Sequence, residues 1–179
     1  MTITEQKTVS IPTGTWTADP VHSSVTFEVQ YLGVSTFSGA VRDLEATLAD
    51  GLISGSARIT SLETKDENLK AHLLSPEFFD AERFPEVSFA STTVDGDGDQ
   101  VEFEGEVTIK GITRPATLTG TITGPVTDPY GNVRYGLQLE TTIGRTQFGI
   151  TWNTPMPDGS KALADDVTLK ADLSLVEAK

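Results

Sequence analysis

Apolar and polar residues alternate with a period of two along most of this chain, and that pattern restricts the folds open to it. In residues 25–31, apolar or aromatic side chains occupy every second position, with polar residues between them. The same pattern recurs in residues 53–60, 101–110, 116–123, 133–141 and 167–175. Successive side chains of a strand point to opposite faces, so each segment has one face for a core and one for water. The sequence therefore predicts many short, one-sided β-strands.

Turn signals separate these segments. Asp50-Gly51 is a strong hairpin signal, and residues 95–100, 110–114 and 128–132 are polar or rich in glycine and proline. Because helices do not alternate with the strands, the pattern favours a barrel or a sandwich over a parallel sheet. A barrel leaves no strand edge exposed, so we predict an all-β fold in the form of a closed antiparallel barrel.

One segment, residues 64–82, breaks the alternation and predicts a helical excursion. Thr64 and Glu67 match a capping box, in which each side chain satisfies a backbone N–H at the start of a helix. The Ser-Pro pair at 75–76 predicts a second short helix, with the serine as its N-cap. A helix inserted between two strands of a barrel is expected to lie across one of its mouths.

Length and charge limit the domain organisation and the partners. The 179 residues suffice for one domain with a sizeable core, and we expect a flexible tail at 1–12 and a single barrel domain at 13–179. A formal net charge of -13 repels phosphate backbones and anionic lipid head groups. No segment has the roughly 18 apolar residues of a membrane span. We therefore expect neither a nucleic-acid partner nor stable membrane insertion.

The chain contains no cysteine, which excludes disulfides, thiolate catalysis and cysteine-based zinc sites. Its first residues are polar and lack the apolar core of a signal peptide, so we expect a cytoplasmic location. A leader removed before this sequence begins would leave the same appearance, and a secreted form therefore stays open.

Small residues occupy many positions that should face the barrel interior, namely Gly55, Ala57, Gly105, Ala116, Gly120, Gly136 and Ala171. Small inward residues leave volume inside a barrel, as in barrels that hold a ligand. They also mark bends and close backbone contacts. We favour a cavity, and the interpretation as bends or close backbone contacts stays open.

Several motifs in order along the chain resemble the YceI-like family. Residues 16–27 match the opening pattern W-x-x-D-x-x-H-S-x-V-x-F, and residues 31–39 match the second strand and its turn. Residues 66–89 match the H-L and F-F-D…F-P-x-x-x-F block, residues 110–115 match G-x-T-(R/K)-P, and residues 145–149 match R-x-x-F-G. Tyr31 and Gln147 depart from the family, which often has His and Asp there.

The resemblance implies an elongated, lipocalin-like barrel of about eight antiparallel strands, with the helical excursion near one end. It also implies a long apolar channel that holds polyisoprenoid chains or similar amphiphiles. The aromatic residues that alternation mostly places inward would then line the channel, although ordinary core packing explains some of them equally well. The predicted ligand-binding residues are Trp16, His22, Phe27, Tyr31, Phe37, His72, Phe89, Phe103, Tyr135, Arg145, Phe148 and Trp152.

The charged and titratable candidates have two interpretations each. If the alternation continues, Arg145 points inward and could hold a phosphate or carbonyl group at the pocket mouth. The alternative is a salt bridge to a loop carboxylate such as Asp19 or Asp80, because buried arginines are usually paired. We expect His22 and His72 to form local hydrogen bonds, or else to contact a ligand head group. They lack metal-ligand spacing, and we predict no metal and no cofactor.

Binding without catalysis is the leading hypothesis for function. The ligand would be an isoprenoid lipid, a quinone or a comparable apolar molecule, which the protein transports or stores. We predict no catalytic residues, because no catalytic constellation is visible. The alternatives are an isomerase or cyclase acting on an apolar substrate, with Tyr31 and Asp19 as the available acid or base, and a stress-response module that binds a protein partner. A homodimer is compatible with the sequence.

Overall fold

The computed structural model describes residues 11–178, so residues 1–10 of the predicted tail lie outside the described part. One antiparallel sheet contains all of the strands named in this part of the chain. The strands are β1 Thr15–Ala18, β2 Ser24–Tyr31, β3 Ser35–Val41, β4 Leu44–Ala49, β5 Leu52–Arg58, β6 Leu62–Glu63, β7 Glu86–Asp97, β8 Gln100–Ile109, β9 Ile112–Thr127, β10 Val133–Gly144 and β11 Leu163–Glu177. Helix α1 is Glu67–Leu74, and two 3₁₀ turns are η1 Ile59–Ser61 and η2 Arg145–Phe148.

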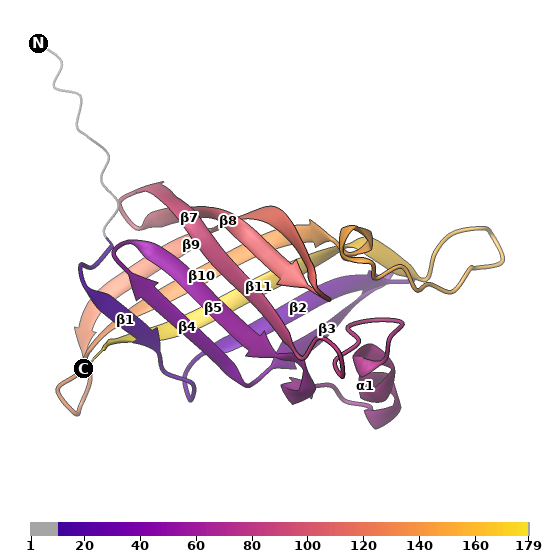
Figure 1. The fold of residues 1–179 in the computed structure, drawn as a ribbon, viewed down its shortest axis with the longest axis horizontal. Coiled ribbons are helices and arrows are strands. Elements are labelled where there is room, and N and C mark those ends of the chain that lie inside the picture. Colours follow the sequence, from indigo (N-terminus) through magenta and orange to yellow (C-terminus); the bar gives the residue numbers. More distant parts are fainter. Residues whose placement is uncertain (1–10, 179) are drawn as a thin grey trace, which may run out of the picture.

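The sheet closes into a barrel because β11 pairs with both β10 and β1 (Figure 1). Three strands of the barrel are bent and carry two names each. The first row consists of β1 and β2, which pair with different parts of β11. In the next row, β4 pairs with β1 and β3 pairs with β2. In the row after that, β5 pairs with β4 and β6 pairs with β3. Counted this way, the eleven segments form eight rows. The predicted closed antiparallel barrel of about eight strands is confirmed.

Tight turns join neighbouring strands where the sequence supplies suitable residues. Asp50 and Gly51 have φ values of 51° and 80°, the left-handed conformation that a two-residue hairpin turn requires. Lys110 and Gly111, with φ values of 53° and 74°, form the equivalent turn between β8 and β9. The hairpin predicted from Asp50-Gly51 is therefore confirmed.

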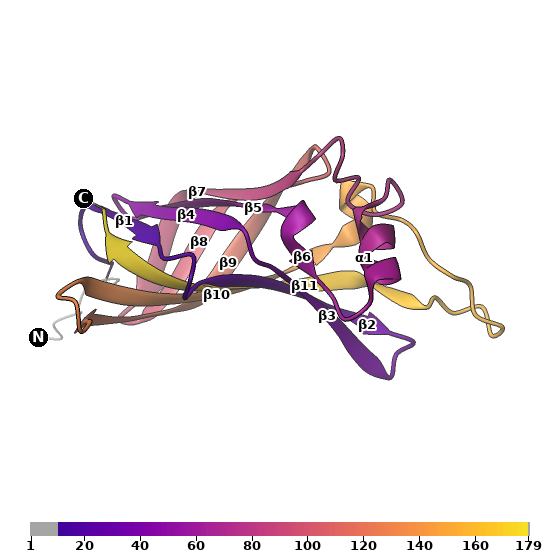
Figure 2. The same ribbon diagram turned by 90° about the horizontal axis from the view of Figure 1, so that it is seen from below.

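The helical excursion lies near one end of the barrel, as predicted, but its details differ from the prediction (Figure 2). The N-cap of α1 is Asp66, whose carboxylate accepts a hydrogen bond from the Leu69 N–H at 2.9 Å, so the capping box from Thr64 to Glu67 was wrong. Asp caps a helix as well as Thr does, and its position sets the start of the helix. Ser75 does not begin a second helix, because its hydroxyl and N–H both donate to the His72 carbonyl and end α1.

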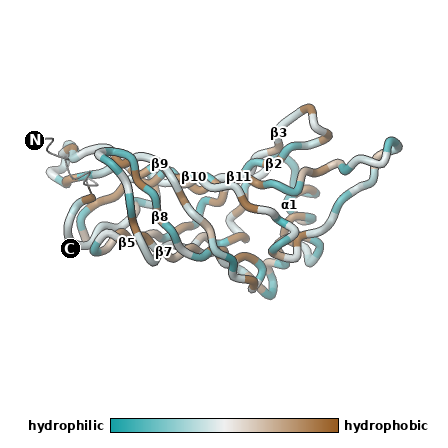
Figure 3. The backbone as a smooth tube through the Cα atoms, turned by 90° about the horizontal axis from the view of Figure 1, so that it is seen from above, coloured by the Kyte–Doolittle hydropathy of each residue, from teal (hydrophilic) through white to brown (hydrophobic). Residues whose placement is uncertain are grey.

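Hydropathy alternates along the barrel strands (Figure 3), and the buried apolar side chains form one core cluster. At the end that contains β1, large buried side chains occupy the interior. This closed-end core comprises Trp16, Leu48, Val101, Phe103, Ile122, Leu137 and Leu175. At the opposite end, where α1 lies, the interior is hollow.

The barrel wall has a seam without backbone pairing between part of β9 and part of β10. β9 and β10 pair only as far as Thr119 and Glu140. Beyond that point, residues 112–118 of β9 pair only with β8, and residues 141–144 of β10 pair only with β11. An outer hollow of about 760 Å³ lies along this seam, and Thr141, Ile143 and Phe148 border both it and the interior.

Candidate ligand-binding site

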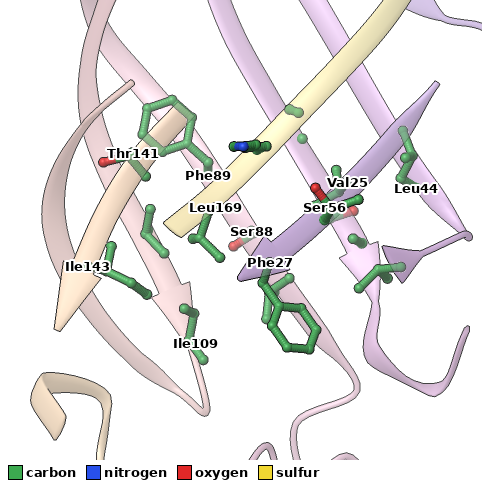
Figure 4. A pocket seen from close by; sticks show the side chains of 18 of the residues that line it. Val25, Phe27, Leu44, Ser56, Ser88, Phe89, Ile109, Thr141, Ile143 and Leu169 are labelled. Atoms are coloured by element: carbon green, nitrogen blue, oxygen red, sulfur yellow. The ribbon is translucent and has the colours of Figure 1, made fainter. Parts of the chain in front are cut away.

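An inner cavity of about 180 Å³ occupies the hollow half of the barrel. Its walls are almost entirely apolar and come from strands on all sides of the barrel, as Figure 4 shows. Representative lining residues are Val25, Phe27, Leu44, Phe89, Ile109, Ile143 and Leu169, with Ser56, Ser88 and Thr141 as minor polar contributors. The cavity therefore presents an almost wholly apolar surface.

Small residues create this space in one region and serve close packing in another. Ala46 and Gly55 are paired across β4 and β5, and both line the cavity, so neither fills the interior. At Gly105 and Gly120, by contrast, an added Cβ would lie 2.1 Å from the Ala90 carbonyl oxygen and 1.6 Å from that of Gln138. Gly55 has both roles, because it lines the cavity and an added Cβ there would lie 2.9 Å from the Glu45 carbonyl oxygen. Both interpretations of the small inward residues therefore hold.

A second, wider cavity of about 600 Å³ lies at the mouth of the barrel, between the strand ends, α1 and the segment 150–163. It shares Phe27, Phe79, Arg145, Ile150 and Val167 with the inner cavity, so the two are adjacent compartments. Rings in edge-to-face contact form part of its wall.

These ring contacts hold α1 against the segment that follows η2. His72 on α1 contacts Phe78 and Trp152 edge-on, with ring centroids 4.9 and 4.7 Å apart. The Nε2 atom of His72 lies 2.5 Å from a Glu77 carboxylate oxygen, which fixes the orientation of the imidazole. As expected from the sequence, His72 forms local contacts, and it also lines the mouth cavity.

Arg145 lies at the boundary of the two cavities and lines both of them. Its side chain is 5% exposed, so the predicted inward orientation is confirmed. The alternative of a salt bridge named the wrong carboxylates, because Asp19 pairs with Arg134 and Asp80 lies 3.6 Å from Arg83. The ion pair of Arg145 is with Asp165, at 3.9 Å. Most of the Arg145 donors instead bond to backbone carbonyls, and burial lowers the pKa of its guanidinium.

The other predicted ligand-binding residues fall into three groups. Phe27, Phe89 and Phe148 line the inner cavity, whereas Tyr31, Phe37, His72 and Trp152 line the mouth cavity, which Phe27 also borders. Trp16, His22, Phe103 and Tyr135 line neither. Trp16 packs edge-on against Tyr135, Phe103 is fully buried, and exposed His22 bonds to Asp19 at 2.7 Å.

Our residue list missed Phe79, Ile150 and Val167, which border both cavities. Phe79 carried a signal that could have found it, because it belongs to an apolar segment expected to cover a mouth of the barrel. Ile150 lies in an irregular segment after η2, where periodicity gives no orientation.

Arg134 joins two carboxylates at the closed end of the barrel. Its Nη1 donates to Asp19 and its Nε to Asp128, at 2.9 and 2.8 Å. Hydrogen bonds from His22, Arg134 and the Val21 N–H lower the pKa of Asp19 to about 2. Arg134 and the backbone N–H of Asn132 hold the pKa of Asp128 well below its usual range.

This network predicts an acid-sensitive contribution to stability. A carboxyl with a lowered folded-state pKa stabilises the fold above its unfolded value near 3.8, and the contribution is lost as the pH falls through the folded value. Wild type should therefore have a higher free energy of unfolding than Arg134→Met. This difference should be largest above pH 4 and shrink toward pH 2. Urea unfolding across this range measures it.

An exposed ion pair provides the control for this experiment. Arg42 bonds to Glu63 with both side chains more than half exposed, so Arg42→Met should have little effect at any pH. A wild-type advantage over Arg134→Met that stays constant down to pH 2 would contradict the assignment.

A closed antiparallel barrel with an apolar, hollow interior defines the lipocalin-like class of barrels. A family profile described as YceI-like domain matches residues 16–175. The chain belongs to the YceI-like family, as the motif resemblance implied. Protein YceI of Escherichia coli O157:H7 is 32% identical over 136 residues, covering 72% of this chain and 71% of that protein. Protein YceI of Salmonella arizonae is 33% identical over 137 residues, covering 73% and 72%.

Solved structures share the fold at lower identity. BcnA of Burkholderia cenocepacia has a TM-score of 0.70 at 18% identity, covering 90% of this chain and 99% of that one. The YceI protein of Campylobacter jejuni has a TM-score of 0.72 at 22% identity, covering 84% and 90%. A polyisoprenoid binding domain from Saccharophagus degradans, implicated in plant cell wall breakdown, has a TM-score of 0.71 at 10% identity, covering 91% and 98%.

Among residues 11–178, no helix has the length and apolar character needed to cross a membrane. In the same part of the chain, no three His, Asp or Glu side chains are grouped in a way that could hold a metal ion.

Proposed function

We propose that this protein binds an apolar isoprenoid-type lipid, such as a polyprenyl chain or a quinone, and transports or stores it without altering it. The observation that carries the proposal is the hollow half of the barrel, where an apolar inner cavity opens into a wider mouth cavity. Burial contributes roughly 0.8 kcal/mol per CH₂ group, so several isoprene units could bind tightly without charged contacts. The polyisoprenoid binding domain that shares this fold supports the choice of ligand.

The arrangement of titratable side chains supports binding rather than catalysis. Tyr31 lines the mouth cavity, and Asp19 is engaged by Arg134 at the closed end. These two candidates for an acid or base in an isomerase or cyclase therefore do not share a cavity. The cytoplasmic location and the homodimer stay predictions.

Native mass spectrometry with organic extraction, applied to the protein purified from its own host, tests the proposal. We expect an apolar species at near one-to-one stoichiometry. A protein that is empty, and that also fails to take up added prenyl lipids and quinones, would contradict lipid binding and favour a partner-binding role.

The two tryptophans allow a second, site-specific measurement. Trp152 lines the mouth cavity, whereas Trp16 belongs to the closed-end core. A quinone should therefore quench the fluorescence of Trp16→Phe, in which only Trp152 remains, and have little effect on that of Trp152→Phe. Equal quenching of both variants would place the ligand elsewhere.

A further inference from the structure

A cationic side chain with an unpaired nitrogen is buried at the boundary of the two cavities. Arg145 begins η2 and lines both compartments with a side chain that is 5% exposed. Its Nη2 atom is fully buried and has no hydrogen-bond partner in the described part of the chain. A buried donor without an acceptor is costly, so such an atom calls for an explanation.

The rest of the guanidinium has a structural role that leaves Nη2 unexplained. Nε donates to the Ala164 carbonyl at 2.9 Å, and Nη1 donates to the carbonyls of Ile150 and Trp152 at 2.9 and 2.8 Å. These bonds satisfy three of the five N–H groups of an arginine and tie the segment after η2 to β11. The two N–H groups on Nη2 remain free.

The nearest carboxylate does not complete the arrangement. A carboxylate oxygen of Asp165 lies 3.9 Å from Nη2, beyond hydrogen-bonding distance, and its side chain is 47% exposed. The other oxygen of that carboxylate lies 3.4 Å from Lys161 Nζ on the surface. Asp165 therefore forms a long ion pair with Arg145 and leaves its Nη2 without a hydrogen bond.

We propose that Arg145 Nη2 is the polar anchor of the site: an amphiphile enters with its chain in the inner cavity and places a head-group oxygen on this atom. The inference rests on the proposed lipid-binding function and narrows the ligand class to chains that carry an oxygen acceptor. A neutral carbonyl, as in a quinone, and an anionic carboxylate or phosphate share this chemistry.

The distribution of polar groups fixes the direction of binding. The inner cavity is almost wholly apolar and accepts the chain. The mouth cavity, which Arg145 also lines, carries the polar side chains of Tyr31, Thr36, His72 and Thr154. The head group therefore lies toward the mouth, at the boundary that Arg145 defines.

Three ligands with the same prenyl chain test the proposal on the wild-type protein: the hydrocarbon, its ketone and its carboxylic acid. Titration calorimetry should show that at least one oxygenated ligand binds about 10- to 100-fold more tightly than the hydrocarbon, the range expected for a hydrogen bond to a charged donor. Without such a donor, the cost of desolvating the oxygen would favour the hydrocarbon. The tighter of the two oxygenated ligands identifies the head group as neutral or anionic.

Variants complete the test. In Arg145→Met, the preference for an oxygenated ligand should disappear. Arg134→Met, which removes an arginine from the closed end, should keep it. Arg145 also bonds to three carbonyls, so Arg145→Met could fail to fold. In that case, the three-ligand series on the wild-type protein still tests whether Arg145 is the anchor.

The outcomes separate this inference from the proposed function. If all three ligands bind equally, lipid binding stands and the anchor is wrong. If none binds, the proposed function itself is contradicted. A preference for oxygenated ligands that persists in a folded Arg145→Met protein would also overturn the anchor.

Discussion

Ala46→Trp should reduce prenyl-lipid binding by at least about 100-fold while leaving the barrel folded. Ala46 lines the inner cavity and faces Gly55 across the β4–β5 pair, so an indole at this position projects into the space that the ligand would fill. Displacing about four CH₂ groups removes roughly 3 kcal/mol of burial, which corresponds to about two orders of magnitude in affinity. Titration calorimetry is the measurement, because the fluorescence of the new tryptophan would overlap with that of Trp16 and Trp152 in a quenching experiment.

The neighbouring residue provides the matched control. Thr47 lies between Ala46 and Leu48 on the opposite face of β4 and lines no cavity. Thr47→Trp adds the same side chain outside the barrel and should leave affinity unchanged. Equal loss of binding in both variants, or full binding by a folded Ala46→Trp protein, would show that the ligand does not occupy the inner cavity.

Phe103→Ala should lower the free energy of unfolding by about 3–5 kcal/mol without changing ligand affinity in the molecules that remain folded. Phe103 is fully buried in the closed-end core and borders neither cavity. Its removal leaves a void among well-packed neighbours, and the ligand would not touch it. Urea unfolding and calorimetric titration of the same preparations measure the two quantities separately.

Phe89→Ala is the comparison variant for Phe103→Ala. Phe89 is partly buried and lines the inner cavity, so we expect it to have fewer packing contacts to lose than Phe103. Its removal should cost less stability than Phe103→Ala and should change affinity. A reversal, with Phe103 affecting affinity and Phe89 only stability, would contradict the location of the ligand in the inner cavity.

The fold was predictable because its signal is local. Period-two alternation gives each strand a buried face regardless of which strand pairs with which, and turns such as Asp50-Gly51 specify antiparallel neighbours. The ends of the helical excursion were harder. Asp66, Thr64 and Ser75 are all good capping residues, and only tertiary packing decides which of them begins or ends the helix.

The site was only partly predictable, because it depends on contacts across the barrel. Alternation places both Trp16 and Phe27 inside, but only the position along the barrel axis separates a core residue from a cavity residue. Gly55 and Gly120 look alike in sequence, and an added Cβ at either would lie against a neighbouring backbone carbonyl oxygen, yet only Gly55 lines the inner cavity. The partners of Arg145 are backbone carbonyls, which leave no trace in side-chain identity.

The unpaired seam between β9 and β10 bears on how much the barrel can hold. Around most of the wall, backbone hydrogen bonds fix the spacing of neighbouring strands, so widening the barrel there would break a ladder. At residues 112–118 and 141–144 no backbone ladder joins β9 to β10. We therefore expect the barrel to widen more easily at this seam than between its paired strands, because every strand would keep its existing hydrogen bonds.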